Sequence, residues 1–474
     1  MEFTIDPEQI TSALALFSNP FYAAWFLFIH GGFLIVLIIV LRALWTMWVS
    51  EVQGAYAASI PKVLLAIRVP RMTEQTPKAV ENIFAHLTGT ASGPGNWKEA
   101  YWQGKVPDTF SVEIVSRGGF IQYFIHAPVS FRDVIEASLY AQYPDAEVVE
   151  VADYTSIAPQ TYPDENIETW GAEVTLAKAF PYPIKTYTAF EHSLDATFKD
   201  PLNSLFEFLG TVKNGEEVWI QIVLQATDDS WVETTASLVR KLTGVKEPAK
   251  KKGRIDKALE HGGTIANLFL DQLTPGAAPA APKKPEKAEG SNIGNLSPGE
   301  KVVLEHVQLK AAKPGYWAKM RIAYVAPKEV FSKGRIATGV LGAYRQFGSP
   351  HINSFKPFKY PKRFSDNFMK KSAAIRTQNK VFKAYVNRSM AGGKPYILNI
   401  EELATLWHFP MMDMKVPLIQ RSEVKTAEPP FFLPMRSEEA DKQRRLSALP
   451  KQSLPSGKPK AFSEEEVPSN LPFA

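Results

Sequence analysis

Cations interleaved with aromatic rings form the densest chemical pattern in this sequence, between residues 356 and 376. The cations are Lys356, Lys359, Lys362, Arg363, Lys370, Lys371 and Arg376. The rings are Phe355, Phe358, Tyr360, Phe364 and Phe368. Cations beside aromatic faces suit the phosphates and bases of a nucleic acid, which is our first interpretation. Anionic lipid and an acidic protein surface are the two alternatives.

The two signs of charge are separated along the chain. Residues 129–235 hold 19 acidic side chains against five basic ones, a net charge of −14. Residues 310–395 hold 19 basic side chains against two acidic ones, a net charge of +17. The formal charge of +5 for the whole chain therefore conceals two opposed regions, and the acidic region is itself a surface that suits the basic one.

Motifs of enzyme catalysis are missing from the sequence. No GxxxxGK[ST], HExxH, GxSxG or GxGxxG occurs, and the eight histidines show no metal spacing. The absence of cysteine excludes thiol nucleophiles, disulfides and cysteine-ligated metals. The pairs Asp228-Asp229 and Glu401-Glu402 are acid/base candidates, but adjacent acids at helix starts usually complement the helix dipole. We therefore expect no enzyme activity, no metal and no cofactor.

One apolar run marks the N-terminal region. Residues 21–41 contain no Asp, Glu, Lys or Arg, and His30 is their only side chain that titrates near neutral pH. A run of 21 residues spans a bilayer as a helix. The residues before it carry acids and no cation, which argues against a signal peptide. Arg42 follows the run, so the positive-inside rule predicts a single-pass inner-membrane protein with its N-terminus outside and its bulk in the cytoplasm. Trp45 and Trp48 lie where an interfacial aromatic belt is expected.

The patterning of the remaining chain predicts an α+β fold. The order from residue 60 to 155 is strand, helix, strand, strand, helix, strand, which is the split βαβ arrangement of ferredoxin-like folds. A second pass follows, and its last strand is expected at residues 396–399. In chain order the expected parts are the extracytoplasmic residues 1–20, the transmembrane helix and interfacial turn at 21–48, the first ferredoxin-like module at 60–155, the second module at 168–245 and 297–410, a helix and flexible linker inserted at 246–296, and an extended proline-rich tail at 426–474.

Several short segments resemble a single family. They are LYAQYPDA at 139–146 with DY at 153–154, YPIKTY at 182–187 with FE at 190–191, WIQ at 219–221, LNIEELATLWHFP at 398–410 and PPFFLP at 429–434. Together they resemble an uncharacterised family of membrane-anchored N-terminal domains from conjugation-like systems of candidate-phylum bacteria, associated with HerA/FtsK-type and type IV secretion coupling ATPases. In that family the segments LxxEELATLxHFP and PPxxLP stand shortly before a P-loop ATPase domain.

The resemblance implies a non-enzymatic component of a type IV secretion-like or DNA-translocation apparatus. The sequence ends at Ala474, where the ATPase domain of those proteins begins, so we expect a separately encoded P-loop ATPase as partner. The predicted contacts with it are the apolar anchors Leu403, Leu406, Trp407 and Phe409. At helical spacing these side chains also suit this chain's own core. The alternative function is a structural scaffold of a pilus or envelope machine, and a homo-oligomer is a further expected assembly.

Overall fold

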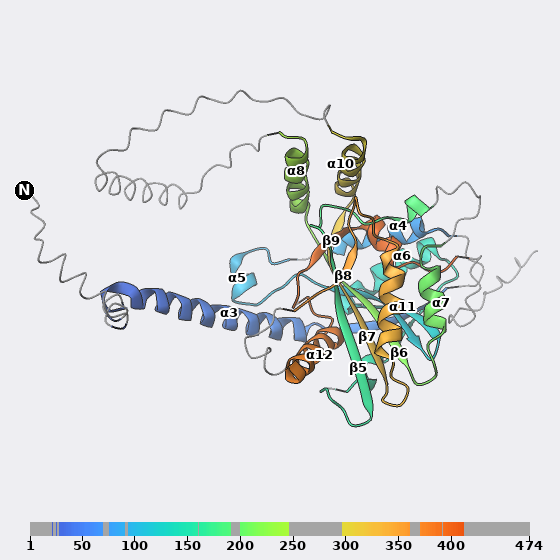
Figure 1. The fold of residues 1–474 in the computed structure, drawn as a ribbon, viewed down its shortest axis with the longest axis horizontal. Coiled ribbons are helices and arrows are strands. Elements are labelled where there is room, and N and C mark those ends of the chain that lie inside the picture. Colours follow the sequence, from blue (N-terminus) through green and yellow to red (C-terminus); the bar gives the residue numbers. More distant parts are fainter. Residues whose placement is uncertain are drawn as a thin grey trace, which may run out of the picture. The chain divides into compact units, whose positions relative to one another are not determined.

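An antiparallel sheet joined to a long N-terminal helix dominates the computed structural model (Figure 1). The structure describes residues 21, 25, 28–69, 75–90, 93–159, 161–190, 200–245, 296–360, 370–390 and 392–411. The predictions for 1–20, for 246–295 and for the tail at 426–474 lie outside these residues. The α+β class expected from the sequence is confirmed.

The sheet contains nine strands among the described residues, and every neighbouring pair is antiparallel. The strands lie in the order β4-β1-β3-β2-β6-β7-β5-β8, and β9 pairs with the start of β7. They are β1 (Lys62–Arg68), β2 (Phe110–Arg117), β3 (Phe120–Pro128), β4 (Glu147–Glu150), β5 (Ile167–Leu176), β6 (Glu217–Ala226), β7 (Gly315–Pro327), β8 (Phe355–Pro357) and β9 (Tyr396–Asn399).

Helices connect and cover these strands. The α-helices are α3 (Phe33–Ser59), α4 (Pro77–Leu87), α5 (Trp97–Tyr101), α6 (Arg132–Gln142), α7 (Asn203–Gly210), α8 (Ser230–Leu242), α10 (Pro298–Ala311), α11 (Lys333–Arg345), α12 (Lys370–Val386) and α13 (Ile400–Leu406). The shorter helical turns are the π-helix η1 (Phe28–Gly32) and the 3₁₀ turns η2 (Thr88–Thr90), η3 (Val129–Phe131), η4 (Tyr154–Ile157) and η5 (Tyr187–Phe190). In Figure 1, α7 and α11 lie side by side over the sheet.

Period-two alternation assigns the strand side chains to two cores. In β6, Val218 and Ile220 belong to the larger core, whereas Trp219 between them belongs to the smaller one. Helices α4, α6, α7, α11 and α13 contribute to the larger core, and α12 and η4 contribute to the smaller one. Because successive strand residues point to opposite faces, the sheet is covered on both sides.

Two similar halves meet in the middle of this sheet. The first half has the order β4-β1-β3-β2, and the second has β6-β7-β5-β8. They join where β2 pairs with β6, in a register that runs from Phe110 opposite Leu224 to Arg117 opposite Glu217. Helices α8 and α10 contact each other and belong to the connection between β6 and β7.

The predicted last strand of the second half was placed wrongly. Residues 396–399 do form a strand, β9, but it pairs with residues 315–318 at the start of β7. The position beside β5 is taken by β8, in which Phe355 lies opposite Leu176. A three-residue strand is too short to show periodicity in sequence, which is why it was missed.

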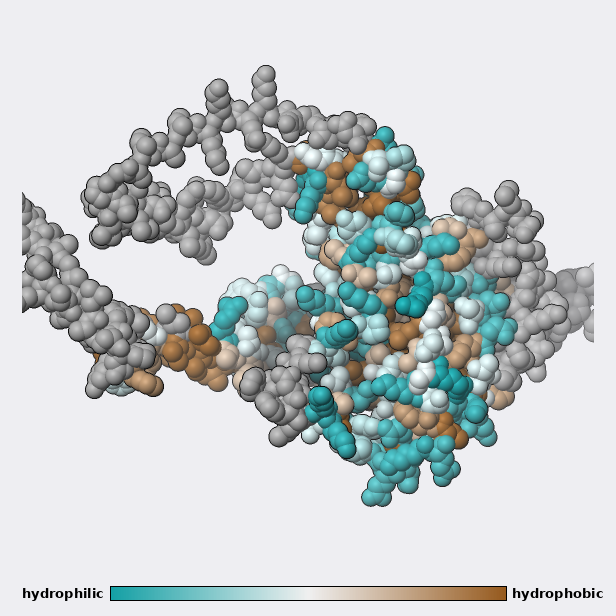
Figure 2. Space-filling model, in the orientation of Figure 1, coloured by the Kyte–Doolittle hydropathy of each residue, from teal (hydrophilic) through white to brown (hydrophobic). Residues whose placement is uncertain are grey.

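The apolar helix continues beyond its predicted end at residue 48. Helix α3 extends to Ser59 and β1 begins at Lys62, so only two residues separate the helix from the sheet. Residues 36–59 are long and apolar enough to cross a membrane, and none of that window is buried in the protein. Figure 2 shows the outer part of α3 as hydrophobic surface.

The four predicted partner contacts near the C-terminal helix lie in the protein's own core. Leu403 and Leu406 are fully buried, and Trp407 and Phe409 are 1% and 2% exposed. The Trp407 ring packs edge-on against Phe84 of α4 and Tyr123 of β3, with centroids 6.0 and 5.7 Å apart. This corrects the assignment of these residues as partner contacts, because α13 closes the large core over the first half of the sheet.

Truncating Trp407 should therefore destabilise the fold. We expect Trp407→Ala to lower the free energy of unfolding by about 3–5 kcal/mol, since a large buried ring leaves a cavity. Urea unfolding of the full chain in detergent measures the loss. The matched control is Val302→Ala on α10, where the side chain is 48% exposed and the change should stay within about 0.5 kcal/mol. Wild-type stability of Trp407→Ala would contradict the packing described.

Candidate functional site

The predicted nucleic-acid-binding residues are divided between two elements. Lys356 lies on β8 and Lys359 follows it, and both are exposed. Lys370, Lys371 and Arg376 are exposed on α12. The remaining two, Lys362 and Arg363, lie outside the described residues. The basic region therefore presents one helix, α12, with several cations and no acid along its length.

The aromatic residues interleaved with these cations turn toward the protein. Phe355 packs edge-on against Tyr344, with centroids 6.2 Å apart. The Tyr360 hydroxyl donates to Glu173 at 2.8 Å, and Phe358 packs against the Tyr360 ring. Phe364 and Phe368 lie outside the described residues. The described rings thus support the fold, and the exposed part of the pattern is its charge.

The carboxylate pairs proposed from sequence hold helix starts. Asn399 and Glu402 form a capping box at α13, because each side chain accepts from the backbone N–H of the other. Glu402 also pairs with the buried Lys310 at 2.9 Å. The neighbouring Glu401 pairs with Lys313 at 2.7 Å. At α8, the Asp228 carboxylate accepts a hydrogen bond from Ser230. Both pairs lie at helix starts, but only Glu402 caps its helix, since Asp229 at the N-cap of α8 makes no side-chain capping hydrogen bond.

A row of four buried polar side chains crosses the smaller core. Glu113 of β2 lies opposite Gln221 of β6, Gln221 lies opposite Arg321 of β7, and Arg321 lies opposite Glu173 of β5. We call Glu113, Gln221, Arg321 and Glu173 the polar row. The Gln221 amide donates to Glu113 at 2.9 Å, and the Arg321 guanidinium lies 3.8 Å from Glu173. None of these residues is more than 3% exposed, so the row joins four strands, and with them both halves of the sheet, away from water.

The segment that follows α12 closes over this row. Arg388 donates to Glu113 at 3.1 Å and pairs with Asp153 at the end of the first half. The backbone carbonyl of Ser389 accepts from Arg321, and that of Gly392 accepts from Lys319. Arg388 has a φ of 45°, a left-handed conformation that is unfavourable for a residue with a Cβ. The buried ion pair explains why this conformation is kept.

Electrostatics hold Glu113 in its charged form. Burial raises the pKa of this carboxyl, but the charge of Arg388 and hydrogen bonds from Arg388, Tyr154 and Ser111 outweigh it, so the pKa lies below its ordinary value. Burial lowers the pKa of Arg388, but Glu113 and Asp153 raise it further, and the net shift is upward. Both groups are therefore ionised at neutral pH, and the arrangement suits structural cohesion.

Sequence reasoning missed the polar row, although a local signal was present. Glu113, Gln221 and Arg321 each stand near the middle of a mainly apolar strand. Polar and charged side chains are seldom buried without a partner, so each of these three residues predicts a buried partner in another segment. The identity of that partner depends on strand order, which periodicity does not reveal.

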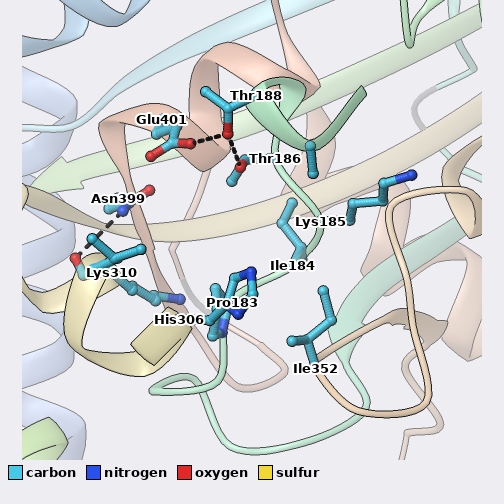
Figure 3. Close-up of a pocket in the computed structure, with 12 residues that line it drawn as sticks. Pro183, Ile184, Lys185, Thr186, Thr188, His306, Lys310, Ile352, Asn399 and Glu401 are labelled. Carbon is cyan, nitrogen blue, oxygen red and sulfur yellow. Dashed lines mark hydrogen bonds between the residues drawn. The ribbon is translucent and has the colours of Figure 1, made fainter. Parts of the chain in front are cut away.

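A pocket of about 200 Å³ lies between α10, α13 and the segment 183–189 (Figure 3). Part of its polar wall is a hydrogen-bonded group in which Thr188 donates to Glu401 at 2.9 Å and shares a hydrogen bond with Thr186. Lys185, His306, Lys310 and Asn399 also line it. Ile184 and Ile352 supply apolar surface. Within the ranges that the structure describes, no cluster of three or more histidine or acidic residues is arranged to hold a metal.

The fold and its interior define an α+β protein with one helix capable of crossing a membrane, attached to a sheet closed by buried ion pairs. The chain belongs to the family described as "Domain of unknown function (DUF8128)", whose model matches residues 61–422. The match begins directly after α3 and covers all the strands. A search of the curated proteins found no match.

Substitutions in the Glu113–Arg388 pair test whether this ion pair holds the segment after α12 to the sheet. We expect Arg388→Met to lower the free energy of unfolding by about 3–5 kcal/mol, because it leaves a buried carboxylate unpaired. Glu113→Gln combined with Arg388→Met should cost less than the sum of the two single changes, since neither partner is then left charged and alone. Lys356→Met, on the exposed β8, serves as the control and should be nearly neutral. Additive single effects would show that the pair does not couple the two segments.

Proposed function

We propose that the chain is a non-enzymatic, single-pass inner-membrane component of a type IV secretion-like or DNA-translocation apparatus. The observation that carries the proposal is the continuity of α3. One helix begins in apolar sequence and ends two residues before β1, which pairs with β3 on one side and β4 on the other. An unbroken helix has a fixed length, so it holds the sheet at a set distance from the bilayer. A scaffold that positions a partner requires this property.

The charges that flank the apolar run support a cytoplasmic body. Glu2, Asp6 and Glu8 precede the run, and Arg42 follows it directly. Lys62 and Arg68 come next, on β1. Cations near a membrane helix favour the cytoplasmic side, so the proposed orientation has the N-terminus outside.

The order of strands supports the finer fold proposal of two ferredoxin-like modules. In the first half, helices α4 and α6 follow β1 and β3, and the strand order is β4-β1-β3-β2. In the second half, α7 and α11 follow β5 and β7, and β8-β5-β7-β6 repeats that order. A split βαβ unit produces this order. The same architecture favours the second candidate function, a structural scaffold of a pilus or envelope machine, whose ferredoxin-like domains commonly lie outside the cytoplasm.

The proposed partner is a separately encoded P-loop ATPase. The resemblance places its attachment around residues 398–434, and the first part of that stretch is α13, which is buried. We therefore assign the attachment to the stretch after residue 411, which includes PPFFLP at 429–434. A proline-rich segment binds a partner in extended form with a small loss of conformational entropy.

Thiol labelling tests the orientation without interference, because the chain has no cysteine. We expect Gln308→Cys on α10, which is exposed, to react only with a membrane-permeable maleimide in intact cells. Thr4→Cys, before the apolar run, should react with an impermeable maleimide as well. The reverse pattern would contradict the cytoplasmic body and favour the pilus or envelope scaffold.

Nucleic acid is the proposed ligand of the basic helix α12. Replacing Lys370 and Lys371 by Ala should flatten the slope of log affinity against log salt by about 1 to 2 for a single-stranded oligonucleotide, since each lysine releases counterions. Fluorescence anisotropy with the full chain in nanodiscs measures the slope. The control replaces Lys301 and Lys333, which are exposed on α10 and α11. Equal slopes for both variants would leave lipid or an acidic protein as the ligand of α12.

A further inference from the structure

We propose that α5 and the residue after it form a second membrane contact, which lies in the lipid interface beside α3. This inference rests on the proposed membrane anchoring of α3. The ligand is the headgroup and glycerol region of the bilayer, where the polar edge of a tryptophan or tyrosine binds water and lipid oxygen while its ring leaves water.

Three aromatic side chains of this segment are exposed. Trp97, Tyr101 and Trp102 are 72%, 44% and 67% exposed. Helix α5 is five residues long and contributes no buried residue to either core. Neighbouring exposed rings form an apolar patch of the kind that marks a binding surface, because their burial against a partner or a membrane is favourable.

The segment is fixed against the membrane helix (Figure 1). Tyr101 packs on Trp45 of α3, with centroids 6.1 Å apart, and Trp102 packs on Trp48 at 5.6 Å. Gln53 donates to the Ala100 carbonyl at 3.3 Å. Aromatic rings of two distant segments therefore form one continuous patch.

Gly104 makes this close approach possible. It is buried and has a φ of 72°, and a Cβ at this position would lie 2.5 Å from the Val52 carbonyl oxygen. Only glycine satisfies both the left-handed backbone and the lack of space. The loop is thus docked on α3 at a defined height.

With the apolar run 21–41 as the membrane span, that height lies at the bilayer interface, with Trp45 in the headgroup region and Trp48 at its outer edge. Trp45 and Trp48 follow Leu41 by four and seven residues, which is about 6 and 10 Å at a rise of about 1.5 Å per residue. The headgroup region extends about 5–8 Å beyond the hydrocarbon core, and a tilted helix rises less. Since Tyr101 and Trp102 pack against these two residues, they lie at the same depth. The exposed Lys98 on the same turn suits lipid phosphate.

The bilayer is favoured over a protein partner by continuity with α3. A protein that covered Trp102 would also cover Trp48, which lies at the height where lipid headgroups already surround α3. A second copy of the chain or another protein remains as an outcome of the test.

Spin labels on single introduced cysteines in the full chain test the contact. The sequence contains no cysteine, so each variant carries its label at one site. The probe is a nanodisc of phosphatidylcholine and phosphatidylglycerol. Labels are placed at Lys98→Cys on α5, Leu37→Cys within the apolar part of α3 and Lys301→Cys on the exposed side of α10. We expect the ratio of oxygen to nickel-chelate accessibility at 98 to lie between the high ratio at 37 and the low ratio at 301. Trp97→Ser with Trp102→Ser should lower the ratio at 98 to that at 301, whereas Trp97→Tyr with Trp102→Tyr should keep it.

Each other outcome has a defined meaning. If 98 matches 301 while 37 lies in lipid, the second contact is refuted and the membrane anchor stands. If 37 also matches 301, the anchor itself is refuted. If the label at residue 98 is inaccessible to both oxygen and the nickel chelate, a protein covers α5, and the assignment to lipid is overturned.

Discussion

Charges buried in the middle of the sheet must meet opposite charges, and this requirement ties the chain together. Glu113 and Glu173 are buried in strands of the two halves, and their cations come from residues 319, 321 and 388. A buried carboxylate without its cation costs several kcal/mol, comparable to a large part of a domain's whole stability. Glu113 of β2 therefore depends on Arg388, which follows the end of β6 by more than 150 residues.

This constraint gives the charge separation along the sequence a physical reason. The acidic region 129–235 and the basic region 310–395 form ion pairs with each other: Glu173 with Lys319 in the interior, and Asp153 with Arg388 and Glu216 with Arg335 nearer the surface. The acidic surface that suits the basic region is in part this chain's own. The cations that remain exposed on α12 are the ones available to a nucleic acid, a lipid or a partner. Helix α3, which is long and apolar enough to cross a membrane, ends two residues before β1, so the closed sheet follows it almost without a linker.

Local elements could be predicted from the sequence, and long-range contacts could not. The order expected over residues 60–155 is that of β1, α4, β2, β3, α6 and β4, and the strand expected at 396–399 is β9. The pairing of β2 with β6 depends on strand order, so no local sequence pattern shows it. Trp407 was assigned to a partner because an apolar helix face reads the same whether it packs inside the chain or against another protein. The cations of 356–376 remain a prediction as ligand contacts.

Hydrogen exchange of the full chain in nanodiscs, followed by mass spectrometry at increasing denaturant, tests most directly whether the two halves form one cooperative body. We predict that the slowest amides of β1–β3 and those of β5–β7 open with the same free energy and the same dependence on denaturant. The reason is that the pairing of β2 with β6 and the polar row join the two halves. A lower free energy and a smaller denaturant slope for β1–β3 alone would show that the first half unfolds independently, which would contradict a single cooperative body.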